Sequence, residues 1–147
     1  MALAQTLMND LKDAMKAGDK IRTETLRMLR SQIKNAAIAA GDELSDDDII
    51  AVLGKEAKKR KESIGMYEKG GRRDLAEKET LEYEIISTYL PAQLSEDELK
   101  AKIKDVIAET GASGMADVGK VMGVLMPAIK GRADGKLAQQ LVKDLLA

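Results

Sequence analysis

Apolar residues recur every three or four positions along the first ninety residues of the chain, which is the spacing of amphipathic α-helices. The pattern predicts four helices: from Leu3 to Gly18, from Asp19 to Gly41, from Ser45 to about Lys69, and from about Arg73 to Leu90. Their apolar stripes are Leu3, Leu7, Leu11 and Met15; Ile21, Leu26, Leu29 and Ile33; Ile49, Leu53, Ala57, Ile64 and Tyr67; and Leu75, Ile85, Ile86 and Tyr89.

Polar residues at the helix ends support these limits. Asp19 and Ser45 are residue types that accept hydrogen bonds from the first backbone amides of a helix. Asp48 follows Ser45 by three residues, as in a capping box. Gly18 can adopt the left-handed backbone conformation that often ends a helix.

Pro91 interrupts the pattern, and the stretch "PAQLSEDEL" predicts a hinge followed by a second capping box, Ser95 with Glu98. Since no segment alternates with period two for long enough to form a strand, the fold class is all-α. The sequence predicts an amino-terminal four-helix domain, residues 1–92, and a three-helix tail domain, residues 93–147.

The tail domain is expected to contain three short helices. Ser113 and Asp134 are placed to cap the second and third of them. The apolar positions are Leu99, Ile103, Val106 and Ile107; Val118, Val121, Met122 and Leu125; and Leu137, Leu141, Val142, Leu145 and Leu146.

The composition is typical of a highly charged helical protein. Hydrophobic residues make up 44% of the 147 residues and charged residues 33%, whereas aromatic residues make up only 2%. No apolar run approaches the roughly 20 residues of a membrane span, and the first residues do not resemble a secretory signal. We therefore expect a cytoplasmic protein without a membrane partner.

The residue types exclude most kinds of catalytic site. The chain has no histidine and no cysteine, which removes the usual nucleophilic dyads and nearly all zinc sites. No phosphate loop or dinucleotide fingerprint is present. The acidic run from Asp46 to Asp48 lies in the first turn of a helix, where carboxylates offset the helix dipole. We expect no catalytic residue, no metal and no cofactor, and activity as an enzyme on its own is not expected.

Two helices carry clustered cations although the net charge is only −1. Arg27, Arg30 and Lys34 lie three and four residues apart and so share one face of the second helix. The stretch "KEAKKRKE" on the third helix adds a second set: Lys58, Lys59 and Arg60. Both sets fit a solvated face with intrahelical ion pairs, and both also fit an anion-binding surface. Arg60 occupies a position where the apolar stripe expects a hydrophobic residue.

A third set of cations lies at the last helix–helix corner, "PAIKGRADGK". Pro127 interrupts the backbone hydrogen bonding, and Lys130, Arg132 and Lys136 surround the start of the final helix. Helix amides at such a start carry a partial positive charge. The corner therefore fits either a simple turn with solvated charges or a site for phosphate or carboxylate.

The stretch "GKVMGVLMPAIKGRADGKLAQQLVKDLL" resembles the YqeY family, as do "RMLRSQIKNAAI", "KRKESIGMYEKGGRRDLAEKE" and "STYLPAQLSEDEL". Residues 93–147 are also similar to the tail domain of the B subunit (GatB) of tRNA-dependent amidotransferases, with a departure at Asp134-Gly135, where that tail tends to carry Asn-Pro. The resemblance implies an all-helical protein whose tail domain helps to hold tRNA, while the amidation chemistry resides in other parts of those enzymes.

Three hypotheses follow. The first is a non-catalytic accessory protein that binds tRNA through the three sets of cations. The second is a protein-interaction module that docks on a tRNA-handling enzyme, such as amidotransferase or aminoacyl-tRNA synthetase components. The third, which rests on the resemblance alone, is participation in glutamine-dependent amide transfer, a carbon–nitrogen ligase reaction.

Overall fold

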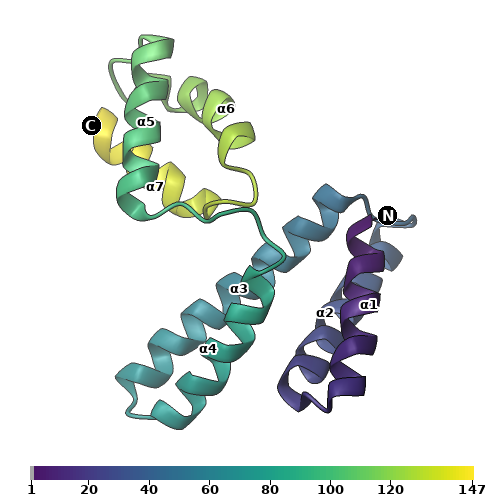
Figure 1. The fold of residues 1–147 in the computed structure, drawn as a ribbon. Coiled ribbons are helices and arrows are strands. Elements are labelled where there is room, and N and C mark those ends of the chain that lie inside the picture. Colours follow the sequence, from purple (N-terminus) through teal and green to yellow (C-terminus); the bar gives the residue numbers. More distant parts are fainter. Residues whose placement is uncertain (1) are drawn as a thin grey trace. The chain divides into compact units, whose positions relative to one another are not determined.

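The computed structural model describes residues 2–147 and is all-helical, which confirms the predicted fold class (Figure 1). No strand occurs in this part of the chain. The helices are α1 (Ala2–Ala17), α2 (Lys20–Ala40), α3 (Asp46–Lys69), α4 (Arg73–Ser87), α5 (Glu96–Thr110), the short 3₁₀ helix η1 (Met115–Asp117), α6 (Val118–Ile129) and α7 (Gly135–Leu146).

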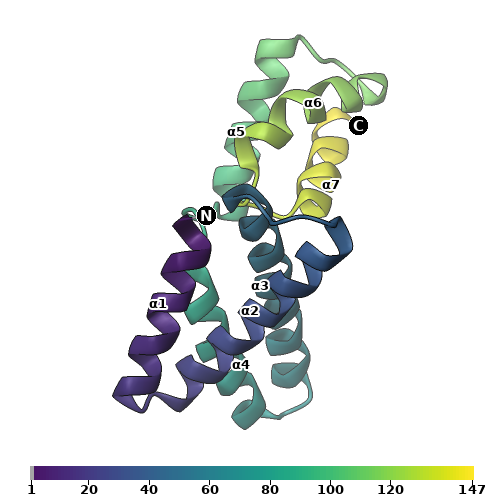
Figure 2. The ribbon, with the colours of Figure 1, turned by 90° about the vertical axis from the view of Figure 1, so that its right-hand side faces the viewer.

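The helices group into two compact units, Met1–Leu90 and Pro91–Ala147, and each has a core of its own. In the first unit, α4 lies beside the carboxyl-terminal part of the longer α3, and α1 pairs with α2 (Figures 1 and 2). Aliphatic side chains from all four helices fill the space between them. The buried set is Leu7, Leu11, Ala14, Leu26, Leu29, Ile49, Leu53, Ala57 and Ile86.

The helix ends of the first unit follow the predicted capping chemistry. Asp19 accepts a hydrogen bond of 3.1 Å from the Arg22 amide, and Ser45 accepts one of 3.2 Å from the Asp48 amide, which is one half of the predicted capping box. Gly18 has φ +68°, a conformation that a residue with a Cβ adopts only under strain. These ends set the lengths of the helices and so the positions of the cations on them.

In the second unit, α5, α6 and α7 surround a separate aliphatic core (Figure 1). The capping box before α5 is complete, because Ser95 accepts from the Glu98 amide and the Glu98 carboxylate accepts from the Ser95 amide. The buried residues are Leu99, Ile103, Val106, Val121, Leu125, Ile129, Ala138, Leu141, Val142 and Leu146.

Some local predictions are wrong. Ser113 does not cap the next helix; its amide donates to the Asp117 carboxylate at 2.9 Å, and η1 precedes α6. Leu137 and Leu145 are exposed rather than buried, because Ala138 and Leu146 take the core positions of α7.

Candidate functional site

The predicted anion site is the corner between α6 and α7, residues 130–136, which we call the elbow; it consists of a tight turn and the first two residues of α7. Lys130 follows the last residue of α6, and Gly131 adopts φ +75°, so the chain reverses within a few residues. Asp134 caps α7 by accepting a hydrogen bond of 3.2 Å from the Lys136 amide. The side chains of Lys130 and Lys136 are exposed, and neither forms an ion pair within residues 2–147.

The elbow is fastened to the segment that precedes α5. The Leu94 amide donates to the Arg132 carbonyl at 2.9 Å, and the Gln93 side-chain amide donates to the Gly131 carbonyl at 2.7 Å. Arg132 itself donates from Nε to the Ala92 carbonyl at 3.0 Å. One donor of the Arg132 guanidinium is therefore committed to the protein backbone, whereas Lys130 and Lys136 lie at the two ends of a turn whose backbone is fixed.

The three predicted cations of α2 line one groove of the first unit. Arg27, Arg30 and Lys34 form its wall, and Arg27 donates from Nη2 to the Met15 sulfur at 3.8 Å. None of the three takes part in an ion pair within the described chain. Their spacing on the helix thus brings three positive charges to the edge of the same hollow.

The floor of this groove is apolar. α1 contributes Leu7 and Met8, α2 contributes Ile33, and Leu44 and Ile49 close the side next to the start of α3. The groove has a volume of about 780 Å³. The groove therefore combines a hydrophobic floor with a cationic wall. A helix face whose charges are only solvated would not need an apolar surface beside them.

The predicted cations of α3 are placed differently. Lys59 donates from Nζ to the Glu56 carboxylate at 3.2 Å, and Arg60 donates from Nη1 to the same carboxylate at 2.6 Å. Nε of Arg60 also lies 3.3 Å from Glu82 and 3.8 Å from Glu79 on α4. Lys58, the third member of the set, is half-buried. Arg60 thus joins α3 to α4 and is engaged within the protein.

Glu56 is the residue that sequence reasoning missed in this network. It is only 4% exposed, although it lies within the charged run that suggested a solvated face. Burial raises the pKa of Glu79, and the neighbouring Glu82 charge raises it further, while the Arg60 charge lowers it. The one sequence feature that could have indicated this network is Arg60, a cation at a position on the apolar stripe of α3.

A second polar cluster was also missed. The Tyr89 hydroxyl donates to the Asp10 carboxylate at 2.5 Å and accepts from Arg22 Nη2 at 3.4 Å. Burial and the Asp10 carboxylate raise the pKa of the Tyr89 phenol well above its usual value. The three residues come from α1, α2 and the turn after α4, so no local sequence pattern relates them.

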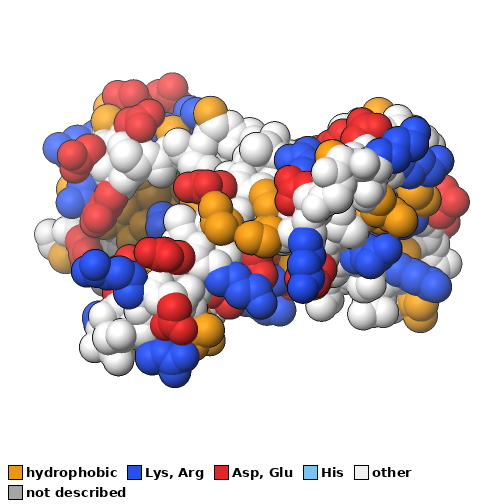
Figure 3. Space-filling model, turned by 60° about the horizontal axis from the view of Figure 1, so that its bottom comes forward, with side chains coloured by type: hydrophobic (Ala, Val, Ile, Leu, Met, Phe, Trp, Pro, Cys, Tyr) orange, Lys and Arg blue, Asp and Glu red, His pale blue; other side chains and the backbone are white. Residues whose placement is uncertain are grey.

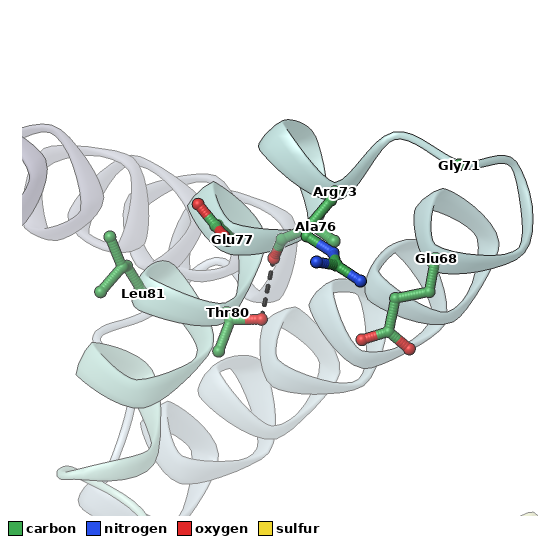
Figure 4. A pocket seen from close by; sticks show the side chains of 7 residues that line it. All are labelled: Glu68, Gly71, Arg73, Ala76, Glu77, Thr80 and Leu81. Carbon is green, nitrogen blue, oxygen red and sulfur yellow. Dashed lines mark hydrogen bonds between the residues drawn. The ribbon is translucent and has the colours of Figure 1, made fainter.

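The other large hollow lies where α3 turns into α4 (Figure 4). Arg73 reaches into the space between the start of α4 and the end of α3, which carries Glu68 (Figure 4). The hydroxyl of Thr80 donates to the Ala76 carbonyl at 2.8 Å, a bond within α4. This hollow has a volume of about 820 Å³, and its charged lining residues are Glu68, Arg73 and Glu77.

The acidic side chains do not form a metal centre in the described part of the chain. Residues 2–147 contain no cluster of three or more histidine, cysteine, aspartate or glutamate side chains able to hold a metal ion. Asp46 accepts a hydrogen bond of 3.2 Å from the Leu3 amide, so this carboxylate ties α3 to α1. None of the described helices has the length and the apolar character needed to cross a membrane.

Charges of both signs are interspersed on the face of the molecule shown in Figure 3, and the net charge of the chain is −1. In Figure 3, lysine and arginine side chains alternate with aspartate and glutamate, and no large patch of one sign appears on the face shown. An anion would therefore be bound by a local group of cations, as in the elbow or the groove, rather than by the field of the whole chain.

Comparison with known proteins identifies the relatives of the chain. Residues 4–146 match the family described as Yqey-like protein. "Altered inheritance of mitochondria protein 41, mitochondrial" of Pyrenophora tritici-repentis is 29% identical over 144 residues, which cover 95% of this chain and 78% of that protein. The protein of the same name from Lachancea thermotolerans is 42% identical over 107 residues, covering 70% and 57%. An uncharacterized protein of Schizosaccharomyces pombe is 34% identical over 93 residues, covering 63% and 76%.

These relatives correct one expectation and leave another untested. The first three relatives are mitochondrial by name, which overturns the expectation of a cytoplasmic protein. That expectation rested on the lack of a secretory signal and of a membrane span, features that do not distinguish one aqueous compartment from another. The chain spans 57% and 64% of the length of two of these relatives. The similarity to the amidotransferase tail domain stays a prediction.

The match extends over nearly the whole chain and includes both helical units, the elbow and the groove. The chain therefore belongs to the YqeY-like family.

Proposed function

We propose that this chain is a non-catalytic accessory protein that binds tRNA through the phosphate backbone, with the elbow as its main contact. The observation that carries the proposal is the pair of exposed lysines, Lys130 and Lys136, at the two ends of the elbow. The backbone between them is fixed by hydrogen bonds that Gln93 and Leu94 donate to the carbonyls of Gly131 and Arg132. Because the turn is ordered in advance, an anion that binds there does not have to order it.

The start of α7 adds to the charge of the two lysines. The unpaired amides of a helix start carry a partial positive charge that favours phosphate groups. Asp134 occupies one of these amides through its bond to Lys136, so the side-chain ammonium groups supply most of the attraction. Arg132 contributes its remaining guanidinium donors, since only Nε is engaged by Ala92.

The composition indicates what kind of RNA contact to expect. Recognition of splayed bases uses aromatic side chains for stacking, and this chain has three tyrosines, no phenylalanine and no tryptophan. One of the tyrosines, Tyr89, is engaged by Asp10 and Arg22. The contact is therefore expected to be with the phosphate backbone and the shape of the RNA, with little dependence on base sequence.

The resemblance to the amidotransferase tail suggests tRNA rather than another polyanion, and it implies amidotransferase or aminoacyl-tRNA synthetase components as protein partners. Participation in amide transfer has no support from the residues, because the chain contains no histidine or cysteine and the described hollows hold no activated nucleophile. The accessory role therefore agrees better with the chemistry available.

A salt titration tests the proposal. Purified chain is titrated with total tRNA and with mitochondrial tRNA, because the named relatives are mitochondrial. Three phosphate contacts predict a slope of the logarithm of the binding constant against the logarithm of salt concentration of roughly −2 to −3. The variant Lys130→Glu, Arg132→Glu, Lys136→Glu should lose most of this binding.

A matched control carries the same change in charge elsewhere. Lys69, Lys78 and Lys104 are exposed and lie outside the elbow and the groove, so Lys69→Glu, Lys78→Glu, Lys104→Glu alters the net charge equally. If both triple variants lose binding to the same extent, the effect comes from overall charge and the proposed contact is wrong. The same conclusion holds if the unaltered chain binds no tRNA.

A further inference from the structure

We propose that the groove of the first unit is a docking site for an amphipathic helix of a partner protein, with acidic residues along one flank of that helix. The groove is defined above by its cationic wall, Arg27, Arg30 and Lys34, and by its apolar floor. This inference is independent of the elbow, so the failure of tRNA binding at the elbow would leave it in place.

The floor favours a protein helix over RNA. Met8, Ile33 and Leu44 are half-buried and form part of the groove surface, and the buried side chains of Leu7 and Ile49 lie beneath them. Covering such a surface with apolar side chains removes it from water, which is favourable, whereas phosphate and ribose groups would lose hydration against it. The apolar face of a helix laid into a groove is a recurrent way of meeting this requirement.

The wall specifies the charge of the partner. Arg27, Arg30 and Lys34 follow one another at intervals of three and four residues, so they extend over about 10 Å along α2. Acidic residues at the same intervals on a partner helix lie on one flank and can face the three cations together. Because these cations form no ion pairs within the described chain, a partner has no internal pairs to break.

Glu43 places a negative charge in the lining of the groove, in addition to the three cations. It lies in the loop after α2, beyond the Lys34 end of the cationic wall. The groove therefore changes from positive to negative along its length. A partner helix with acidic residues opposite α2 and a basic residue near Glu43 is favoured in one orientation over the reverse.

Synthetic peptides test the proposal with the full chain. The probes are labelled helical peptides with a leucine face and glutamates at positions i, i+3 and i+7, made with the acidic flank in three registers around the helix. A peptide of the same composition in scrambled order and one with lysine in place of glutamate serve as controls. At least one acidic peptide should bind, and neither control should.

Variants of the chain locate the binding. The wall variant Arg27→Gln, Arg30→Gln, Lys34→Gln should bind the acidic peptide about tenfold more weakly or worse, since it removes three partly exposed ion pairs. The control variant Lys69→Gln, Lys78→Gln, Lys104→Gln should bind normally. Charge reversal, Arg27→Glu, Arg30→Glu, Lys34→Glu, should create binding of the lysine peptide, a gain that a misfolded variant cannot show.

Methionine methyl resonances report the position directly. Met8 lines the groove, whereas Met66 and Met115 are exposed outside it. The acidic peptide should shift the Met8 methyl signal and leave those of Met66 and Met115 unchanged. Shifts confined to the other two methyl groups would place the peptide elsewhere and overturn the proposal.

Three further outcomes would also overturn it: no binding by any acidic peptide, equal binding by the wall variant, or displacement of a bound peptide by tRNA that requires the wall cations. A second copy of this chain as the occupant is another alternative. It would appear as a concentration-dependent dimer that the wall variant dissociates, and it too would exclude the partner helix.

Discussion

Arg60 donates a hydrogen bond of 2.6 Å to the carboxylate of Glu56, one turn earlier on α3, and both side chains are largely shielded from water. The side chain of Arg60 is 16% exposed and that of Glu56 6%. The same guanidinium reaches Glu82 on α4 at 3.3 Å. A charged pair within one helix therefore also connects two helices of the first unit.

Replacing Arg60 should destabilise this unit. Arg60→Met keeps the aliphatic packing but leaves Glu56 with Lys59 as its remaining partner, at 3.2 Å. Removal of one partner from a buried pair typically costs about 3–5 kcal/mol, and the remaining lysine places the expected loss near the lower value. Urea unfolding followed by tyrosine fluorescence measures it, since all three tyrosines lie in the first unit.

Lys61→Met provides the comparison for that experiment. Lys61 is the next residue on α3, is exposed and forms no ion pair within the described chain. It should change the free energy of unfolding by less than about 0.5 kcal/mol. Equal losses in Arg60→Met and Lys61→Met would show that the network between α3 and α4 contributes nothing.

Glu79 is the third carboxylate near Arg60. Its replacement should not lower the free energy of unfolding, in contrast to the replacement of Arg60. The raised pKa of Glu79 means that the folded chain binds this proton more tightly than the unfolded chain does. The stability that it contributes is fully present below the unfolded pKa, about 4.3, and is lost as the pH rises through the folded pKa. Glu79→Gln should therefore leave the unfolding free energy at neutral pH unchanged or raise it by a few tenths of a kcal/mol, about the size of a surface effect.

Unfolding curves at neutral pH and near pH 4 distinguish this prediction from a simple loss of an ion pair. The advantage of Glu79→Gln over the unaltered chain should shrink as the pH falls, because the native carboxyl then becomes protonated. A variant that is clearly less stable at neutral pH would show that the attraction of Glu79 to Arg60, at 3.8 Å, outweighs its burial.

The local rules that predicted the helices account well for their ends and less well for their buried faces. Asp19, Ser45, Ser95 and Asp134 all accept the amide hydrogen bonds expected of caps, because capping depends on residues within one turn. Ser113 fails, since the Asp117 carboxylate accepts its amide and the chain forms η1 there instead.

Burial depends on the exact helical period and on neighbouring helices. The spacing of four from Leu3 to Met15 drifts around a helix of 3.6 residues per turn, so Ala14 takes the core position and Met15 is 51% exposed. Likewise, Arg60 could be recognised as unusual from its place on the apolar stripe, but Glu79 and Glu82 lie on another helix. The cationic wall of α2 was visible in the sequence; the apolar floor was not, because it combines α1, α2 and the start of α3.

The Tyr89 phenol should lose its proton at a higher pH than a free tyrosine does, because its hydroxyl is buried and donates a hydrogen bond to Asp10. A free tyrosine ionises near pH 10, and both burial and the adjacent carboxylate raise the pKa of Tyr89 above this value. The unfolded chain then releases this proton at lower pH than the folded chain does. The stability contributed by Tyr89 is complete below about pH 10 and is lost as the pH rises through the folded pKa.

Tyrosinate absorbance of the unaltered chain and of Tyr89→Phe isolates this group by difference. The difference curve should rise only above about pH 10, and urea should move it down to the ordinary range. Tyr89→Phe should also cost about 1 kcal/mol of stability at neutral pH through the lost hydrogen bond to Asp10. A difference curve centred at the ordinary value in the folded chain would contradict the bond to Asp10.

Substitutions of Asp134 should distinguish its role in capping α7 from its effect on anion binding at the elbow. Its carboxylate accepts the Lys136 amide, and its negative charge opposes that of any phosphate near Lys130 and Lys136. Asparagine caps helices about as well as aspartate, so Asp134→Asn should leave the melting temperature nearly unchanged. Because the repulsive charge is gone, tRNA should bind this variant several-fold more tightly at low salt, with less difference at high salt.

Asp134→Ala completes the comparison, since it removes both the charge and the cap. The loss of the cap should cost about 1 kcal/mol of stability in the second unit, which far-ultraviolet circular dichroism detects although that unit has no tyrosine. Binding of tRNA at low salt and thermal unfolding are measured for both variants. If Asp134→Asn binds tRNA no more tightly than the unaltered chain, the phosphate groups do not approach the start of α7, and the elbow is a structural corner whose lysines face only water.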